Sequence, residues 1–195
     1  MVARRDEAQE HDILGAASRI LSEEGSAALT VRRIAAEAGC STMGIYSRFG
    51  GKEGVLDALY AEGFQSLCAD MSALDRTDDP VDDLRRCELR YRDHALAHAA
   101  HYLVMFGGAV PDFVPSPESK ALAMGAFANL VAAVQRCVDA GAFKGEAPEL
   151  AHTLWSAMHG QVMLELVGIN PVGGDADARY RDLVDTVLDG LQARR

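Results

Sequence analysis

The apolar residues of this chain recur at helical spacing, and glycine and proline interrupt the pattern at intervals. Ile13, Ala16 and Ile20 follow the rhythm of an amphipathic helix that ends at Gly25. No segment shows the alternating pattern of a strand, and no internal repeat is present. The sequence therefore predicts an all-α fold, with helices over about residues 7–24, 31–38, 42–49, 52–74, 81–106, 117–140, 149–168 and 176–193. A break in the 81–106 helix near residues 98–101 stays open as an alternative.

Composition limits the class of protein. A chain of 195 residues corresponds to one or two domains, and a hydrophobic content of 49% is enough for a packed core. No stretch approaches about 18 uncharged apolar residues, which argues against a membrane span. The N-terminal sequence MVARRDEAQEH lacks the apolar region of a secretory signal, so we expect a cytoplasmic protein with no membrane partner. The cysteines form no C-x-x-C pair and are expected to be buried free thiols; they are Cys40, Cys68, Cys87 and Cys137.

The charge is unevenly distributed along the chain. Residues 1–55 contain seven Lys and Arg against eight Asp and Glu, whereas residues 56–195 contain twelve against twenty-one. A net charge of −10 does not suit a protein that coats nucleic acid indiscriminately. It does not exclude a local binding face, for which the nearly neutral N-terminal part is the better candidate.

The segment 41-STMGIYSRFGGKEG-54 predicts a short helix whose outer face has little to bury. Ile45 and Phe49 are four residues apart and are assigned to the core. With the 31–38 helix and the short turn between them, this helix has the arrangement of a helix-turn-helix, whose second helix enters the major groove of DNA. The candidates for base contact are Thr42, Met43 and Gly44, of which Met43 can lie against a thymine methyl; those for phosphate contact are Ser41, Tyr46 and Arg48.

Three cations lie at helix starts, where an isolated helix would not favour them. Arg32 and Arg33 lie in the first turn of the 31–38 helix, and Lys52 lies in the first turn of the helix after residue 51. A cation there opposes the helix dipole by roughly 0.3–1 kcal/mol. A bound phosphate reverses the sign, because the dipole and the cation then both attract the anion. All three residues are candidates for DNA contact, and an accident of the surface is the alternative.

The segment 30-TVRRIAAEAGCSTMGIYSRFGGKEGVLDALY-60 resembles the DNA-binding domain of the TetR family of bacterial transcriptional repressors. The matching positions are Thr30, Ile34-Ala35, Ala38-Gly39, Ser41, Tyr46, Phe49, Lys52-Glu53 and Leu56. The resemblance implies phosphate contacts for Thr30, Tyr46 and Lys52, and base contacts for Arg32, Thr42, Met43 and Gly44. A packed core tyrosine is the alternative for Tyr46. Arg33, Cys40 and Met43-Gly44 depart from the family pattern, so the operator of a relative does not carry over.

The C-terminal part resembles the effector-binding domain of a TetR subgroup named for a Trp-His-Gly signature, here Trp155 with His159-Gly160. The segment 91-YRDHALAHAAHYLVMFG-107 is similar to the same subgroup. The resemblance implies a homodimer in which two helices of each subunit form a four-helix interface. The residues assigned to it are Leu150, Leu154, Val162, Leu183, Val184, Val187, Leu188 and Leu191. A core within one subunit is the alternative for the same apolar stripe.

Large apolar and aromatic residues of the C-terminal part suit a cavity for an apolar ligand. The candidates are Met105, Phe106, Met124, Phe127, Trp155, Met158 and His159, with an ordinary core as the alternative for each. His94, His98 and His101 share one helical face, where three imidazoles could bind a divalent metal. No carboxylate at a matching spacing completes that site, so we expect no metal and no cofactor.

These patterns together predict a ligand-responsive transcriptional repressor and not an enzyme. A helix-turn-helix domain over residues 1–54 would bind a palindromic duplex operator, and a helical domain over residues 55–195 would dimerise and bind a small, mostly apolar or aromatic effector. No Ser-His-Asp arrangement, P-loop or nucleophile elbow is found. The nearer alternative is an activator with the same fold. The alternative from another class is a metal-binding protein or metalloenzyme that uses the histidine face.

Overall fold

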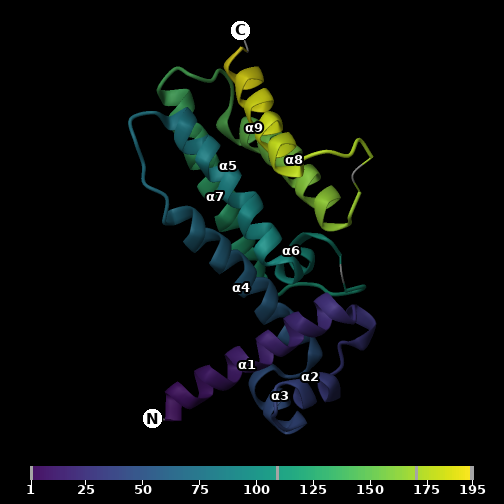
Figure 1. Ribbon diagram of the computed structural model, residues 1–195. Helices are drawn as coiled ribbons and strands as arrows, with labels where there is room; N and C mark the ends of the chain where they lie inside the picture. Colours follow the sequence, from purple (N-terminus) through teal and green to yellow (C-terminus); the bar gives the residue numbers. More distant parts are fainter. Residues whose placement is uncertain (1, 109, 170, 194–195) are drawn as a thin grey trace. The chain divides into compact units, whose positions relative to one another are not determined.

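The computed structural model describes residues 2–108, 110–169 and 171–193. Within these residues it contains α-helices and one short 3-10 helix, and no strand (Figure 1). In chain order the elements are α1 (Val2–Glu23), η1 (Ser26–Ala28), α2 (Val31–Glu37), α3 (Thr42–Phe49), α4 (Lys52–Ser72), α5 (Pro80–Ala97), α6 (Ala99–Phe106), α7 (Pro117–Asp139), α8 (Ala147–Leu166) and α9 (Ala176–Gln192). The all-α prediction is confirmed.

The structure differs from the predicted helices at two places. α1 begins at Val2, well before the predicted start near residue 7, because its polar first turns offer no apolar periodicity to a sequence pattern. The predicted 81–106 helix is divided at His98, whose φ of −121° and ψ of 43° lie outside the helical region. The break that the sequence left open is therefore present, although no proline marks it.

Packing divides the chain into two compact units. The first comprises Met1–Gln65 and His98–Ala123, and the second comprises Ser66–Ala97 and Met124–Arg195. α4 and α7 each contribute residues to both units. Because the units are defined by packing, the functional boundary that we place after residue 54 stays a prediction.

The first unit is built around α1. This helix packs against α2 and α6, and α2 packs against α3. The isoleucines that set the apolar rhythm of the sequence, Ile13, Ile20, Ile34 and Ile45, are at most 1% exposed. The amphipathic pattern of the N-terminal helices is thus used in a common core, which leaves the opposite side of α3 in solvent.

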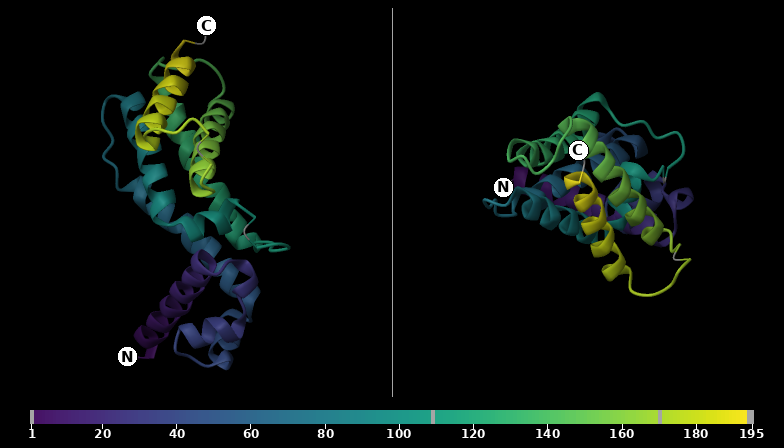
Figure 2. Two further views of the ribbon diagram at one scale, coloured as in Figure 1. Left: turned by 45° about the vertical axis from the view of Figure 1, so that its right-hand side comes forward. Right: turned by 90° about the horizontal axis from the view of Figure 1, so that it is seen from above.

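In the second unit α5, α8 and α9 lie side by side (Figures 1 and 2). Leu154, Met158 and Leu188 are 0% exposed between them. Arg92 of α5, itself 8% exposed, joins the three helices through Glu165 of α8 at 2.9 Å and Asp177 of α9 at 3.0 Å. A buried guanidinium needs such partners, because an unpaired charge in a core is costly.

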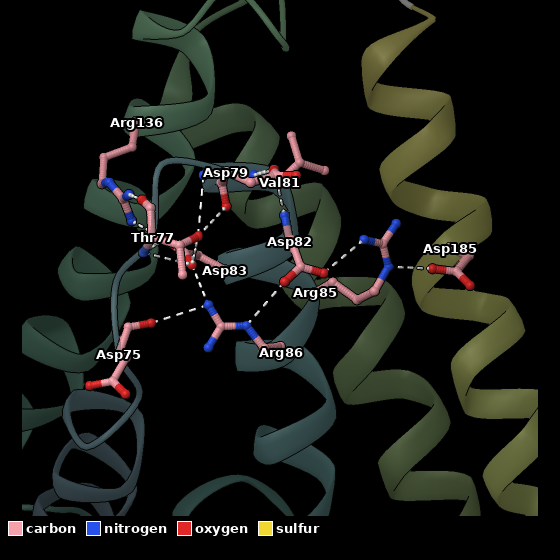
Figure 3. Close-up of polar contacts among 10 residues, drawn as sticks. All are labelled: Asp75, Thr77, Asp79, Val81, Asp82, Asp83, Arg85, Arg86, Arg136 and Asp185. Carbon is pink, nitrogen blue, oxygen red and sulfur yellow. Dashed lines mark hydrogen bonds and ion pairs between the residues drawn. The ribbon is translucent and has the colours of Figure 1, made fainter.

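A second polar cluster fixes the loop before α5 (Figure 3). The Asp83 carboxylate accepts hydrogen bonds from the Thr77 backbone N–H at 2.9 Å, the Thr77 hydroxyl at 2.8 Å and Arg136 of α7 at 2.9 Å. Burial acts to raise the pKa of Asp83, but these donors outweigh it and lower the pKa to about 2. Arg85 extends the cluster to Asp185 of α9 at 2.6 Å. The loop, α5, α7 and α9 are therefore tied together by charge.

α7 is the helix that bears on the expectation against a membrane span, although Lys120 and Arg136 bound its uncharged stretch. Among the described helices it is the one whose length and composition suffice to cross a bilayer, and a single helix of this kind is weak support for a span. One side of α7 is packed into the second unit, since Val134 and Cys137 are 0% exposed. The other side carries Met124, which is 66% exposed.

Candidate functional site

The two helices of the helix-turn-helix are fixed at their ends by local contacts. The Thr30 hydroxyl accepts a hydrogen bond from the Arg33 backbone N–H at 3.2 Å and caps α2, and the Ser41 hydroxyl accepts one from the Gly44 N–H at 3.1 Å and caps α3. Between them Gly39 adopts a φ of 64°, which favours glycine, and ends α2. Thr30 and Ser41 therefore have the same local role, each as the N-cap of one helix of the motif.

One face of α3 packs against the core of the first unit, and the opposite face is exposed to solvent. Ile45 is 0% exposed, as expected of a core residue, whereas Phe49, also assigned to the core, is only half-buried. On the other side Met43 is 73% exposed and Tyr46 is 54% exposed, with Thr42 also exposed. A packed core tyrosine would be far less accessible than Tyr46 is. The outer face of α3 therefore consists of side chains that the core does not use.

Gly54 holds α3 against α4 and was not singled out by sequence reasoning. It lies in the first turns of α4, where glycine costs about 1 kcal/mol relative to alanine. A Cβ at this position would overlap the backbone carbonyl of Phe49, the last residue of α3. Any side chain here would thus displace the end of α3. An unexplained glycine within a helical pattern is the signal that could have found it.

Two of the four candidate arginines and lysines are already bound within the first unit. Arg33 pairs with Glu24 at 2.6 Å and Glu37 at 2.9 Å, and these carboxylates raise its pKa further. Arg48 pairs with Asp6 of α1 at 2.7 Å. The position of Arg33 at a helix start therefore has an explanation within the protein.

Arg32 and Lys52 differ from this pair. Neither takes part in an ion pair among the residues that the structure describes. Arg32 is exposed, and Lys52 is the first residue of α4. The first turn of α2 contains no acidic residue that would favour its dipole. At Arg32 an external anion would be stabilised by both a cation and a helix N-terminus; at Lys52 the same holds, although Glu53 also lies in the first turn of α4.

Comparison with known proteins identifies the chain. Residues 13–59 match the profile of the bacterial regulatory proteins of the tetR family, and residues 84–187 match that of the Tetracyclin repressor-like C-terminal domain. The second match alone covers more than half of the chain. The protein belongs to the TetR family. It is thus a transcriptional regulator with an N-terminal helix-turn-helix, and Trp155, His159 and Gly160 lie inside the C-terminal match.

Relatives of known sequence or structure agree with this assignment. An uncharacterised HTH-type transcriptional regulator of Mycobacterium tuberculosis is 25% identical over 99% of this chain and 86% of its own. A protein of unknown function from Rhodococcus sp. RHA1 has a similar structure, with a TM-score of 0.81 and 24% identity over 94% of this chain and 95% of its own. A TetR family regulator from Thermus thermophilus has a TM-score of 0.74 and 24% identity, over 94% and 99% of the two chains. The structural matches establish the fold alone.

The effector candidates of this TetR-family protein are divided between the two units. In the first unit Met105 is 8% exposed, and the Phe106 ring lies 4.9 Å from that of Tyr102 and 5.3 Å from that of Phe64. The other five candidates, Met124, Phe127, Trp155, Met158 and His159, belong to the second unit. Met105 and Phe106 thus pack within a cluster of the first unit.

In the second unit an aromatic cluster surrounds Trp155. Its ring lies 6.1 Å from that of Phe127 on α7 and 5.4 Å from that of His159 on α8, and its indole N–H donates to the Tyr91 hydroxyl of α5 at 3.3 Å. Burial lowers the pKa of His159, which favours the neutral imidazole. The structure thus brings Phe127, Trp155 and His159 together and adds Tyr91, which the sequence did not indicate.

Two of the predicted lining residues lie outside this aromatic cluster. Met158 is 0% exposed in the core of the second unit, and Met124 is 66% exposed on α7. Neither takes part in the ring contacts around Trp155. The assignment of Met124 and Met158 to a ligand cavity therefore stays a prediction, which rests on their size and flexibility.

Most residues assigned to the dimer interface are buried within one subunit. Leu150, Leu154, Val162, Val184, Leu188 and Leu191 are at most 2% exposed, whereas Leu183 and Val187 are half-buried. The stripe therefore serves the core of the second unit. Four exposed residues of α8 lie along another line of this helix at four-residue spacing: His152, Ser156, Gly160 and Leu164.

Two of the three histidines of the predicted face, His94 and His101, bind carboxylates of α4. His94 lies 3.0 Å from Asp70, and His101 lies 3.0 Å from Glu62; each imidazole lowers the pKa of its carboxyl partner. The sequence could not show these partners, because they come from another helix. Among the described residues no group of three or more His, Cys, Asp or Glu side chains could hold a metal ion. The structure thus offers no support for the metalloprotein alternative.

Proposed function

We propose that this TetR-family regulator is a homodimeric repressor that binds a palindromic operator and releases it when a small, mostly apolar or aromatic effector binds. The observation that carries the DNA-binding part is the outer face of α3. Met43 and Tyr46 are exposed there without a role in the core. Arg32 and Lys52, which form no ion pair with any described residue, lie at the starts of α2 and α4. A short helix bordered by such cations suits the major groove and its phosphates.

The proposed DNA contacts follow from these positions. Thr30, Ser41, Tyr46 and Lys52 would bind phosphates; Thr30 and Ser41 are the N-caps of α2 and α3. Arg32, Thr42, Met43 and Gly44 would face bases. Arg33 and Arg48 contribute mainly to the structure of the domain, because both guanidinium groups already bind carboxylates.

The dimer would form through the second unit. The exposed line on α8 contains Ser156 and Gly160, whose small size allows a helix of a second copy to approach closely, and Leu164, which is 42% exposed. Leu183 and Val187 of α9 retain part of their apolar surface. Two recognition helices would then lie one turn of DNA apart, roughly 34–36 Å.

The effector would bind beside Trp155. Phe127, Trp155 and His159 supply aromatic area, and the Tyr91 hydroxyl and the neutral His159 imidazole supply hydrogen bonds. No lysine or arginine is among the proposed lining residues, so no cation would offset the free-energy cost of removing a polyanionic ligand from water. The effector must bind the DNA-incompetent form more tightly than the competent form, since equal affinity would shift nothing.

Selection from random duplexes with the full chain tests the proposal. We expect enrichment of a palindromic site, and sedimentation of the complex should give two chains per duplex. Met43→Ala and Tyr46→Ala should weaken binding, whereas Ala132→Ser on the exposed side of α7 serves as a matched surface control. A chain that enriches no site, or that occupies its site as a monomer, contradicts the proposal. A promoter fused to the enriched site distinguishes repression from activation.

A further inference from the structure

The outer face of α3 lacks the chemistry with which proteins usually read guanine or adenine. Guanine is read by two donors of one arginine or lysine, and adenine by the amide of asparagine or glutamine. The exposed side chains of α3 are Thr42, Met43, Tyr46 and Ser47. None of these side chains can form the bidentate hydrogen bonds with which guanine or adenine is usually read. Within the described α3 residues, Arg48 alone carries a suitable group.

Arg48 is held inside the domain. Its Nη2 donates to the Asp6 carboxylate of α1 at 2.7 Å, and its Nη1 lies 3.5 Å from the Gly44 carbonyl. The side chain is 21% exposed, and its Nε is buried without a hydrogen-bond partner in the described part of the chain. Moving this guanidinium to a base would break the ion pair that joins α1 to α3. Arg48 is therefore placed to orient α3.

Met43 is the most exposed large apolar side chain of α3, and it has no role in the core of the first unit. It is 73% exposed, and its thioether is apolar and polarisable. Gly44 follows it, so the backbone on that side of α3 can approach a surface closely. The major groove has one apolar group, the 5-methyl of thymine. Contact between the two would remove apolar area of both from water.

We propose that this protein selects its half-site by contact of Met43 with a thymine 5-methyl group, while Arg48, tied to Asp6, positions the recognition helix and reads no base. The inference rests on the proposed function, because it requires that α3 enters the major groove. It specifies what Met43 recognises on that face: a methyl group, at one base position of each half-site.

The direct test removes the methyl group and leaves the base pair. In the enriched duplex each thymine of one half-site is replaced in turn by deoxyuridine, and binding of the full chain is measured. We expect one position at which the Kd rises about three- to ten-fold. At that position Met43→Ala should bind the thymine and uridine duplexes alike. Replacing the T·A pair by C·G should weaken binding, and 5-methylcytosine should restore part of it.

The role of Arg48 is tested by Asp6 variants, which keep the guanidinium. Asp6→Asn should weaken binding to all duplexes while the preferred sequence stays the same, and Asp6→Glu should restore affinity. Loss of a guanine preference at one position in Arg48→Met would show that Arg48 reads a base, and would overturn the proposal.

The outcomes separate this inference from the proposed function. An enriched palindrome whose binding is indifferent to uridine at every position overturns the methyl contact and leaves the repressor proposal intact. The same holds if the uridine effect persists unchanged in Met43→Ala. If no site is enriched, the proposed function fails and the inference fails with it. The uridine series needs no variant, so misfolding of a variant does not affect it.

Discussion

The outer face of α3 and the apolar stripe of α8 and α9 were both assigned to binding functions from the sequence, but in the structure they differ in solvent exposure. The α3 face remains exposed, with Met43 at 73% and Tyr46 at 54%. The α8 and α9 stripe is largely buried in the core of the second unit, where Leu154 and Leu188 are 0% exposed. Residues that a fold does not use are informative about function. Apolar residues at helical spacing are more simply explained by burial in the core of their own subunit.

The same contrast separates two adjacent arginines. Arg32 and Arg33 share the first turn of α2 and looked equivalent in the sequence. Arg33 binds Glu24 and Glu37, which lie on either side of it in the chain, whereas Arg32 takes part in no ion pair among the described residues. A cation at a helix start is thus a signal for an external anion only when the fold supplies no carboxylate.

The largest expected effect concerns the stripe itself. Leu154→Ala should lower the free energy of unfolding of the subunit by about 4 kcal/mol, because it removes buried area and leaves a cavity. Leu164→Ala, at a 42% exposed position of the same helix, should cost less than about 1 kcal/mol but weaken dimerisation. Urea unfolding at several protein concentrations and sedimentation equilibrium measure the two effects. If Leu154→Ala weakened the dimer and left the subunit stable, the stripe would be the interface after all.

Glu88 of α5 should make the stability of the second unit dependent on pH. It is 4% exposed, and burial raises its pKa to about 8. The folded state then holds a proton that the unfolded state loses near pH 4.5. This stabilisation is complete below about pH 4.5 and is lost as the pH rises to about 8, by roughly 5 kcal/mol. Glu88→Gln should remove most of that loss.

Chemical unfolding at intervals between pH 5 and pH 8.5 measures the Glu88 effect. Glu149→Gln, at an exposed position of α8, is the matched control and should leave the pH profile of the wild type unchanged. Equal pH profiles for the wild type and Glu88→Gln would show that Glu88 does not titrate in this range.

A smaller effect is expected at the DNA face. Lys52→Ala should weaken binding to every duplex by on the order of 1 kcal/mol and lower the slope of log affinity against log salt by ~0.9. Arg76→Ala, which removes an exposed cation from the second unit, is the control and should change neither quantity much. Titrations at several salt concentrations decide the matter. A change in the preferred sequence in Lys52→Ala would contradict the phosphate role.

The smallest effect on stability is expected at Trp155. Trp155→Phe keeps an aromatic ring and loses the hydrogen bond to Tyr91, so unfolding should change by about 1 kcal/mol or less and effector-free DNA binding should be retained. A compound that releases the operator should perturb the fluorescence of this single tryptophan in the wild type. The same compound should act more weakly on Trp155→Phe and Phe127→Ala, with Thr153→Ala as the exposed control. Undiminished release from both variants would place the effector elsewhere.

The sequence by itself determined the positions of most helices and of the helix-turn-helix motif. Local physics fixes these features: caps at Thr30 and Ser41 and a left-handed glycine at Gly39 act within a few residues. The same locality explains why α3 was predicted at its observed bounds, Thr42–Phe49. The outer face could be recognised because its residue types do not suit a core.

The tertiary structure alone decided which side chains had partners. The carboxylates that bind Arg48, His94 and His101 come from other helices, 24 to 42 residues away in sequence, and no spacing rule connects them. The buried stripe of α8 and α9 was ambiguous for a related reason. A periodic apolar face specifies that it will be covered, but burial is non-directional and does not specify whether the cover is the same chain or a second copy.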